Sequence, residues 1–97
     1  METITFEYHA LQSVKHRSHV GVVGSGDLEI LLEPSQNQRA HVAIRTSVAG
    51  FRETWQAVLD RFFRRSQAAA TIEINDFGAT PSVVALRLAQ VVEESQT

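Results

Sequence analysis

The sequence contains no cysteine among its 97 residues. This absence excludes disulfides, thiolate nucleophiles, cysteine-ligated zinc sites and iron–sulfur clusters together. Any thiol chemistry in which the chain takes part must use a thiol that is not its own. The length corresponds to a single domain over residues 1–97. A domain of this size has one modest core, which argues against a large internal catalytic cavity.

A strong excess of one charge is also missing. Nine Lys and Arg residues stand against eleven Asp and Glu, for a net charge of −2, whereas a DNA-binding domain normally carries a marked basic excess. We therefore expect no nucleic-acid partner. No apolar run approaches the ~20 residues of a membrane span. The first residues, METITFEYHA, lack the apolar segment of a signal peptide. We expect a cytoplasmic protein with no direct membrane insertion.

Alternation of apolar and polar residues predicts strands over residues 3–8, 28–32, 42–46 and 71–75. Apolar residues also resume at 20–23, and the segment GSGD at 24–27 separates them from the strand over 28–32. Two such runs on either side of a short glycine-containing break predict a β-hairpin. Segments 10–18 and 34–40 are polar enough to be connections between strands.

Two segments show helical patterns. One apolar stripe follows the i, i+3, i+4, i+7, i+8 spacing of a helix and consists of Trp55, Val58, Leu59, Phe62 and Phe63. A second helix is predicted to begin with Thr80 as N-cap and Pro81 as the first helical residue. It would run to about residue 94 and bury Val84, Leu88 and Val91. The predicted fold is an α+β two-layer sandwich, a mainly antiparallel sheet with two helices on one face. The order of the strands is left open.

The most unusual local feature is Ser25, which lies between Gly24 and Gly26. Glycine on both sides permits a positive φ and removes bulk beside the serine, so its hydroxyl would be open to the active site of another protein. The ordinary interpretation is that these are hairpin turn residues. Of the two acidic residues that follow, Asp27 and Glu29, either could steer basic partners or simply keep the outer face of the strand soluble.

Other chemistry finds less support in the sequence. The histidines, His9, His16, His19 and His41, match no metal-binding spacing, so no metal site is expected. A hydrolase that used Ser25 as nucleophile would need one of these histidines within hydrogen-bond reach. The tripeptide Asp76-Phe77-Gly78 is predicted to end a strand and to turn into the second helix. The FFRR cluster at 62–65 is typical of a solvated basic helix end, where the positive charge of arginine interacts favourably with the negative end of the helix dipole.

Four stretches of the chain resemble one known family. They are METITFEY at 1–8, VGSGDLEILLEP at 23–34, RTSVAGF at 45–51 and IEINDFGATPSVVALRL at 72–88. Together they resemble the acyl carrier (delta) subunits of malonate decarboxylases and, more distantly, the carrier chain of citrate lyase. The GSGDLE and DFGATP segments are the specific parts of this resemblance, and two such segments at a matching separation are stronger than either alone.

The resemblance implies a phosphoprotein that carries its reactive group covalently. In that family the serine of GSGDLE, here Ser25, bears a phosphoribosyl-dephospho-CoA arm (2'-(5''-phosphoribosyl)-3'-dephospho-CoA) that ends in a thiol. The implied subunit has no catalytic residues. It carries acetyl and malonyl thioesters for the decarboxylation of malonate to acetate and carbon dioxide. The implied partners are a prosthetic-group transferase, a malonyl transferase, and the acyl transferase and decarboxylase subunits.

One departure from other carriers bears on the type of arm. Carriers of the fatty-acid type present Asp-Ser-Leu at the start of a helix, whereas Ser25 is followed by Gly26 and Asp27 in a predicted turn. This favours the dephospho-CoA arm over phosphopantetheine. The alternative function is that of a non-enzymatic adaptor or structural domain, in which GSGD is only a hairpin turn.

Overall fold

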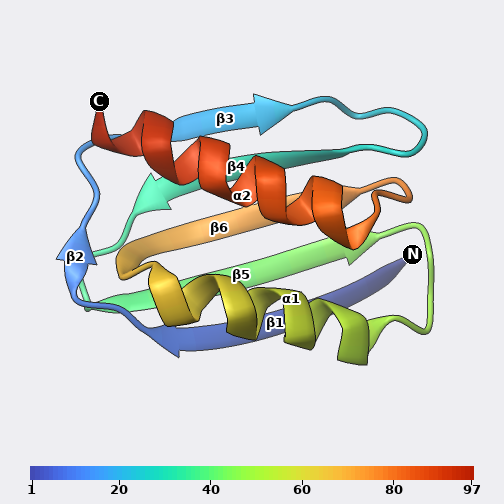
Figure 1. The fold of residues 1–97 in the computed structure, drawn as a ribbon, viewed down its shortest axis with the longest axis horizontal. Coiled ribbons are helices and arrows are strands. Elements are labelled where there is room, and N and C mark those ends of the chain that lie inside the picture. Colours follow the sequence, from blue (N-terminus) through green and yellow to red (C-terminus); the bar gives the residue numbers. More distant parts are fainter.

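Six strands form one sheet in the computed structural model, which describes residues 1–97. The elements in chain order are β1 (Glu2–His9), β2 (Gln12–Ser13), β3 (Ser18–Gly21), β4 (Leu28–Pro34), β5 (Arg39–Thr46), α1 (Arg52–Arg65), β6 (Ala68–Asp76) and α2 (Pro81–Gln96). The strand order is β1-β5-β6-β4-β3, and the short β2 pairs with the start of β6 (Figure 1). The pairs β1–β5, β4–β6 and β3–β4 are antiparallel, while β5–β6 and β2–β6 are parallel.

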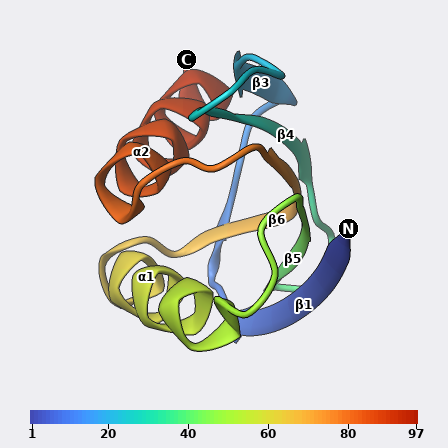
Figure 2. The ribbon, with the colours of Figure 1, turned by 90° about the vertical axis from the view of Figure 1, so that its right-hand side faces the viewer.

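Both helices cover the same face of this sheet, and the other face is open (Figure 2). The buried side chains of each strand face the helices. On the central strand β6, for example, Ile72 and Ile74 are fully buried while Thr71 and Glu73 are exposed. The helices contribute the remainder of the core with Trp55, Leu59 and Phe63 from α1 and Val84, Leu88 and Val91 from α2. The predicted α+β sandwich is confirmed.

The strand order is the part of the fold that the alternation patterns left open. The last strand of the chain, β6, lies between β4 and β5, so the two strands joined by the 35–38 loop are not neighbours. Parallel strands need a crossover connection, usually a helix, and α1 is the crossover between β5 and β6. All the other large pairings can then be antiparallel.

Several boundaries differ from the predictions. The segment predicted as a polar connection, 10–18, contains β2 and two buried apolar side chains, Ala10 and Val14. The strand β3 ends at Gly21, and the apolar residues after it, Val22 and Val23, lie exposed in the loop. Gly21 has φ +83°, and a Cβ there would lie 2.1 Å from the carbonyl oxygen of Leu28. Only glycine fits at this position, and its left-handed backbone ends the strand.

The second helix begins where the sequence predicts. The Oγ1 of Thr80 accepts a hydrogen bond from the N–H of Val83 at 3.3 Å, and Pro81 occupies the first helical position. The helix ends at Gln96, slightly beyond the predicted end. Neither helix is long and apolar enough to cross a membrane.

Candidate functional site

Ser25 lies at the tip of the loop that joins β3 to β4. The N–H of Asp27 donates a hydrogen bond to the carbonyl oxygen of Gly24 at 3.1 Å, which closes a β-turn with Ser25 and Gly26 at its two central positions. Gly26 has φ +75°, as the third position of a type II turn requires. Ser25 is exposed, and its hydroxyl makes no hydrogen bond within the chain, so it is free to react.

The loop is held from behind by the connection between β6 and α2. The N–H of Gly26 donates to the carbonyl oxygen of Phe77 at 2.8 Å, and the N–H of Phe77 donates to the carbonyl oxygen of Asp27 at 2.9 Å. A Cβ on Gly78 would lie 3.9 Å from the Cα of Gly26. The GSGDLE and DFGATP segments, far apart in the sequence, are therefore in direct contact.

An ion pair ties the same loop to α2. The guanidinium of Arg87 donates to both carboxylate oxygens of Asp27, with Nη2–Oδ2 at 3.0 Å and Nε–Oδ1 at 3.4 Å. The N–H of Leu28 also donates to Oδ1 at 2.7 Å. The hydrogen bond from Leu28, followed by that from Arg87, lowers the pKa of Asp27 below its ordinary value. The carboxylate is charged at neutral pH and helps to fix the turn in place.

The acidic residues beside Ser25 are already engaged within the chain. Asp27 pairs with Arg87, while Glu29 accepts a hydrogen bond from Asn75 at 2.9 Å and faces His19 at 3.1 Å. Neither carboxylate is free to steer a basic partner. The structure therefore favours a local, structural role for both.

Asp76 supports the site from inside the protein, although the sequence pattern predicted it only as part of a turn. It is 3% exposed. Its Oδ2 accepts from the hydroxyl of Thr46 at 2.8 Å, and its Oδ1 accepts from the N–H of Ala79 at 3.0 Å. These bonds join the end of β5 to the connection that holds the Ser25 loop. A signal was present, because Asp76 continues the buried phase of Ile72 and Ile74 along one strand.

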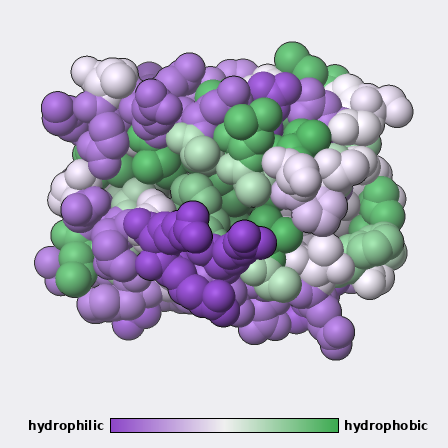
Figure 3. Space-filling view, in the orientation of Figure 1, coloured by the Kyte–Doolittle hydropathy of each residue, from purple (hydrophilic) through white to green (hydrophobic).

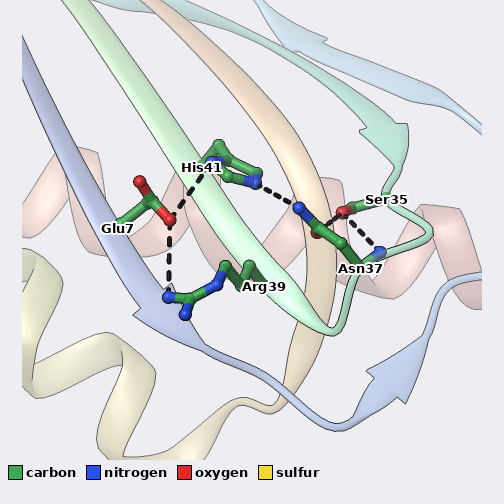
Figure 4. A network of polar contacts seen from close by, with 5 residues as sticks. All are labelled: Glu7, Ser35, Asn37, Arg39 and His41. Atoms are coloured by element: carbon green, nitrogen blue, oxygen red, sulfur yellow. Dashed lines mark hydrogen bonds and ion pairs between the residues drawn. The ribbon is translucent and has the colours of Figure 1, made fainter.

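The histidines lie away from Ser25. His41 belongs to a polar network in which its Nδ1 faces Glu7 at 3.7 Å, Asn37 donates to its Nε2 at 3.0 Å, and Arg39 also faces Glu7 at 3.4 Å (Figure 4). This network lies at the start of β5. The β6–α2 connection, which contacts the Ser25 loop, lies beside the end of β5, so His41 and Ser25 are at opposite ends of the sheet.

No histidine forms a hydrogen bond with Ser25: His19 faces Glu29, and the Nδ1 of His16 contacts the carbonyl oxygen of Arg17. The geometry required for a serine hydrolase is absent. No group of three or more metal-ligating side chains comes together anywhere in the chain.

A small rigid body that presents an exposed serine without a neighbouring base is the architecture of a carrier domain. The family model of the malonate decarboxylase delta subunit (MdcD), an acyl carrier protein family, matches residues 15–95. The chain belongs to this family, which confirms the resemblance carried by its motifs.

Named relatives support the assignment over nearly the whole chain. The malonate decarboxylase acyl carrier protein of Stutzerimonas stutzeri (strain A1501) is 50% identical over 95 residues, covering 97% of this chain and 96% of the relative. That of Azotobacter vinelandii (strain DJ / ATCC BAA-1303) is 48% identical over the same shares. A chain in the crystal structure of a Pseudomonas malonate decarboxylase hetero-tetramer in complex with malonate is 49% identical. It superimposes with a TM-score of 0.92 over 97% of this chain and 98% of its own.

Proposed function

We propose that Ser25 is the attachment site of a covalent phosphoribosyl-dephospho-CoA arm. In this proposal the chain is the non-catalytic acyl carrier subunit of a cytoplasmic malonate decarboxylase. The observation that carries the proposal is the exposed, unpartnered hydroxyl of Ser25 on a turn between two glycines. Membership of an acyl carrier family supports the covalent prosthetic group in general, and the GSGDLE segment supports this particular serine.

The residues around Ser25 fit a bulky phosphodiester. Outside the adjoining residues, no atom lies within 4 Å of the position where a Cβ of Gly26 would be, and a Cβ on Gly24 would meet only a methyl of Val22 at 3.9 Å. Neither residue beside the exposed Ser25 is therefore crowded by other parts of the chain. Attachment replaces the O–H bond of Ser25 by a bond from Oγ to phosphorus, while the bond from that phosphorus to the leaving group of an activated form of the arm breaks. The transferase must supply the base that takes the hydroxyl proton, because the chain has none at this site. Once attached, the arm supplies the thiol that the chain lacks.

In this proposal the rest of the domain fixes the position of Ser25 and supplies no reacting side chain. The paired backbone hydrogen bonds between Gly26, Phe77 and Asp27 and the ion pair to Arg87 hold the turn on the fold. A flexible arm that starts from a fixed point keeps its end at a high effective concentration near each partner site. No side chain of this chain needs to contact the reacting group.

The partners follow from the proposed role. The related chain in the Pseudomonas structure is part of a hetero-tetramer that binds malonate. We propose that this subunit meets the acyl transferase and decarboxylase subunits of such a complex, a malonyl transferase, and the prosthetic-group transferase that loads it. The net reaction of the complex would convert malonate to acetate and carbon dioxide.

Mass spectrometry of the native complex tests the proposal directly. We expect the intact mass of this subunit to exceed the mass of its sequence by that of the arm, and peptide analysis to place the addition on Ser25. Ser25→Ala is expected to abolish both the added mass and the malonate-dependent release of carbon dioxide.

Ser13→Ala is the matched control, because Ser13 is another exposed serine and lies in β2 at the opposite end of the sheet. It is expected to leave loading and activity unchanged. An unmodified Ser25 in the native complex would refute the proposal. Full activity of the Ser25→Ala complex would favour the adaptor alternative, in which GSGD is only a turn.

A further inference from the structure

The connections at the two ends of the sheet differ in charge. At the Ser25 end lie three connections, residues 22–27, 47–51 and 77–80, whose one charged side chain is Asp27, and Asp27 is paired with Arg87. The strand register brings them together, because Leu28 and Thr46 both pair with Asp76 at this end. We call these three connections the neutral end. The connections at the other end include Lys15 and Arg17, and α1 ends there at Arg65.

The neutral end also exposes apolar side chains. Large hydrophobic side chains are exposed there on two of its connections, with Val22 and Val23 at 60%, Phe51 at 50% and Val48 at 38%. Figure 3 shows hydrophobic atoms toward the right-hand side, where Figure 1 places these loops, and strongly hydrophilic atoms over α1. Exposed apolar residues gathered in one region, rather than scattered singly, are typical of an interaction site.

A cavity opens at the margin of the neutral end, between the two helices. Its volume is about 240 Å³, and its lining includes Val48, Phe51, Trp55, Ala79 and Pro81. An apolar cavity of about 150 Å³ is large enough to hold benzene, so this one has room for an aromatic or leucine side chain. Interface hot spots commonly consist of such an anchor in a pocket.

The charged groups nearest to this end are already satisfied. Asp27 is paired with Arg87, the carboxylate of Glu2 accepts a hydrogen bond from the N–H of Gly50 at 3.3 Å, and Arg52 lies 5.2 Å above the ring of Phe6. The charge closest to Ser25 is therefore paired within the chain, and what the three connections offer a partner is mainly apolar surface.

We propose that the neutral end is the surface by which this subunit docks on its malonate decarboxylase partners. The partner surface would be an uncharged, apolar rim around an active-site entrance that donates one apolar side chain to the cavity between α1 and α2. The inference rests on the proposed carrier function, because each partner must approach the end that bears Ser25. A docking surface that surrounds the attachment point also delivers the arm directly to the partner site.

Binding of the purified chain to the remaining subunits of the complex, measured by calorimetry, tests this surface. We expect Val23→Glu and Phe51→Glu each to weaken binding by about tenfold or more, as a charge in a desolvated apolar contact does. Leu11→Glu is the matched control. Leu11 is 58% exposed but lies beside the opposite end of the sheet, so binding should stay within about twofold of the unsubstituted chain.

Two further measurements separate this surface from an electrostatic one. Ala79→Leu fills the cavity from this chain's own side and is expected to weaken binding by about tenfold without lowering the unfolding temperature. Raising the salt from about 50 to 500 mM should change the affinity by less than about threefold, because contacts between neutral surfaces are not screened. Each variant is first compared with the unsubstituted chain in thermal unfolding.

All binding is measured in a Ser25→Ala background, so that no arm contributes. Docking that survives in this background supports the surface whatever the mass of the native subunit proves to be. Unchanged binding of Val23→Glu and Phe51→Glu would overturn the inference. So would a loss of about tenfold on adding salt or on Arg65→Glu, since either would point to a charged interface at another surface.

Discussion

The glycines around Ser25 allow a graded test of the loop geometry, because alanine meets a different obstacle at each of three positions. At Gly26, φ is +75° and the added Cβ would meet no atom within 4 Å outside the adjoining residues, so the expected cost comes from the backbone conformation alone. The left-handed conformation costs an L-residue about 1–2 kcal/mol. Alanine returns about 0.4–1 kcal/mol by restricting the unfolded chain. The net expected loss in the free energy of unfolding for Gly26→Ala is about 1 kcal/mol.

The other two glycines are expected to give a smaller and a larger loss in the free energy of unfolding than Gly26. Gly24 does not have a positive φ, and its added Cβ would meet only a methyl group at 3.9 Å. Gly24→Ala should therefore leave stability unchanged or raise it by up to about 1 kcal/mol. At Gly21 the added Cβ would lie 2.1 Å from a backbone carbonyl oxygen of β4, and φ is +83°. Strain and overpacking together should make Gly21→Ala cost about 3 kcal/mol or more.

Urea and thermal unfolding followed by circular dichroism measure the series. A loss of 1 kcal/mol lowers the unfolding temperature of a domain of this size by roughly 4–8 °C. The expected order of stability is Gly24→Ala, then Gly26→Ala, then Gly21→Ala. The reasoning would be refuted if Gly24→Ala were as destabilising as Gly26→Ala, or if Gly21→Ala were the mildest of the three.

Three further predictions concern the supports of the fold. Thr80→Ala removes the N-cap hydrogen bond of α2 and should lower the free energy of unfolding by about 1 kcal/mol in urea titrations, whereas Thr80→Ser should retain most of it. Burial, with the hydrogen bond to Asp60, raises the pKa of Tyr8 well above 10. The folded state therefore binds that proton more tightly, and its stabilisation is complete below the unfolded pKa near 10 and is lost as the pH rises above it. Tyr8→Phe should flatten the alkaline decline in the urea midpoint, and an unchanged slope would contradict this origin. The lowered pKa of Asp27 has the opposite effect, since the stabilisation is present above the unfolded pKa near 4 and is lost as the pH falls below it. The pH dependence of unfolding between about pH 5 and 2 should be shallower in Asp27→Asn and in Arg87→Gln, and a parallel curve in either variant would argue against the ion pair.

Local patterns in the sequence were enough to predict most of the elements. Alternation identified the long strands because burial on one face of a sheet repeats every second residue, whatever the strand pairs with. The Thr80–Pro81 start of α2 was predictable because capping involves only neighbouring residues. The exceptions, Val22 and Val23, are apolar residues that the fold leaves exposed, so hydropathy alone assigned them to a strand.

Contacts between residues far apart in the sequence could not be predicted from these local patterns. The position of β6 between β4 and β5 follows from the crossover through α1 and from packing over the whole sheet. No local pattern pairs Arg87 with Asp27, which lie 60 residues apart and meet only in the folded chain. The contact between Gly26 and Phe77 joins two loops whose separation along the chain has no local signature.

By itself, the sequence determined that this protein has no thiol, that a serine stands on an open turn, and that the chain builds strands and two helices of the observed types. These properties depend on residue identity and on spacings of a few positions. Only the tertiary structure decided which segments hold that turn, that no histidine reaches it, and that three connections whose one charged side chain is paired meet there. These depend on the pairing of distant strands, because the free energy that selects the pairing comes from burial over the whole core rather than from any single segment.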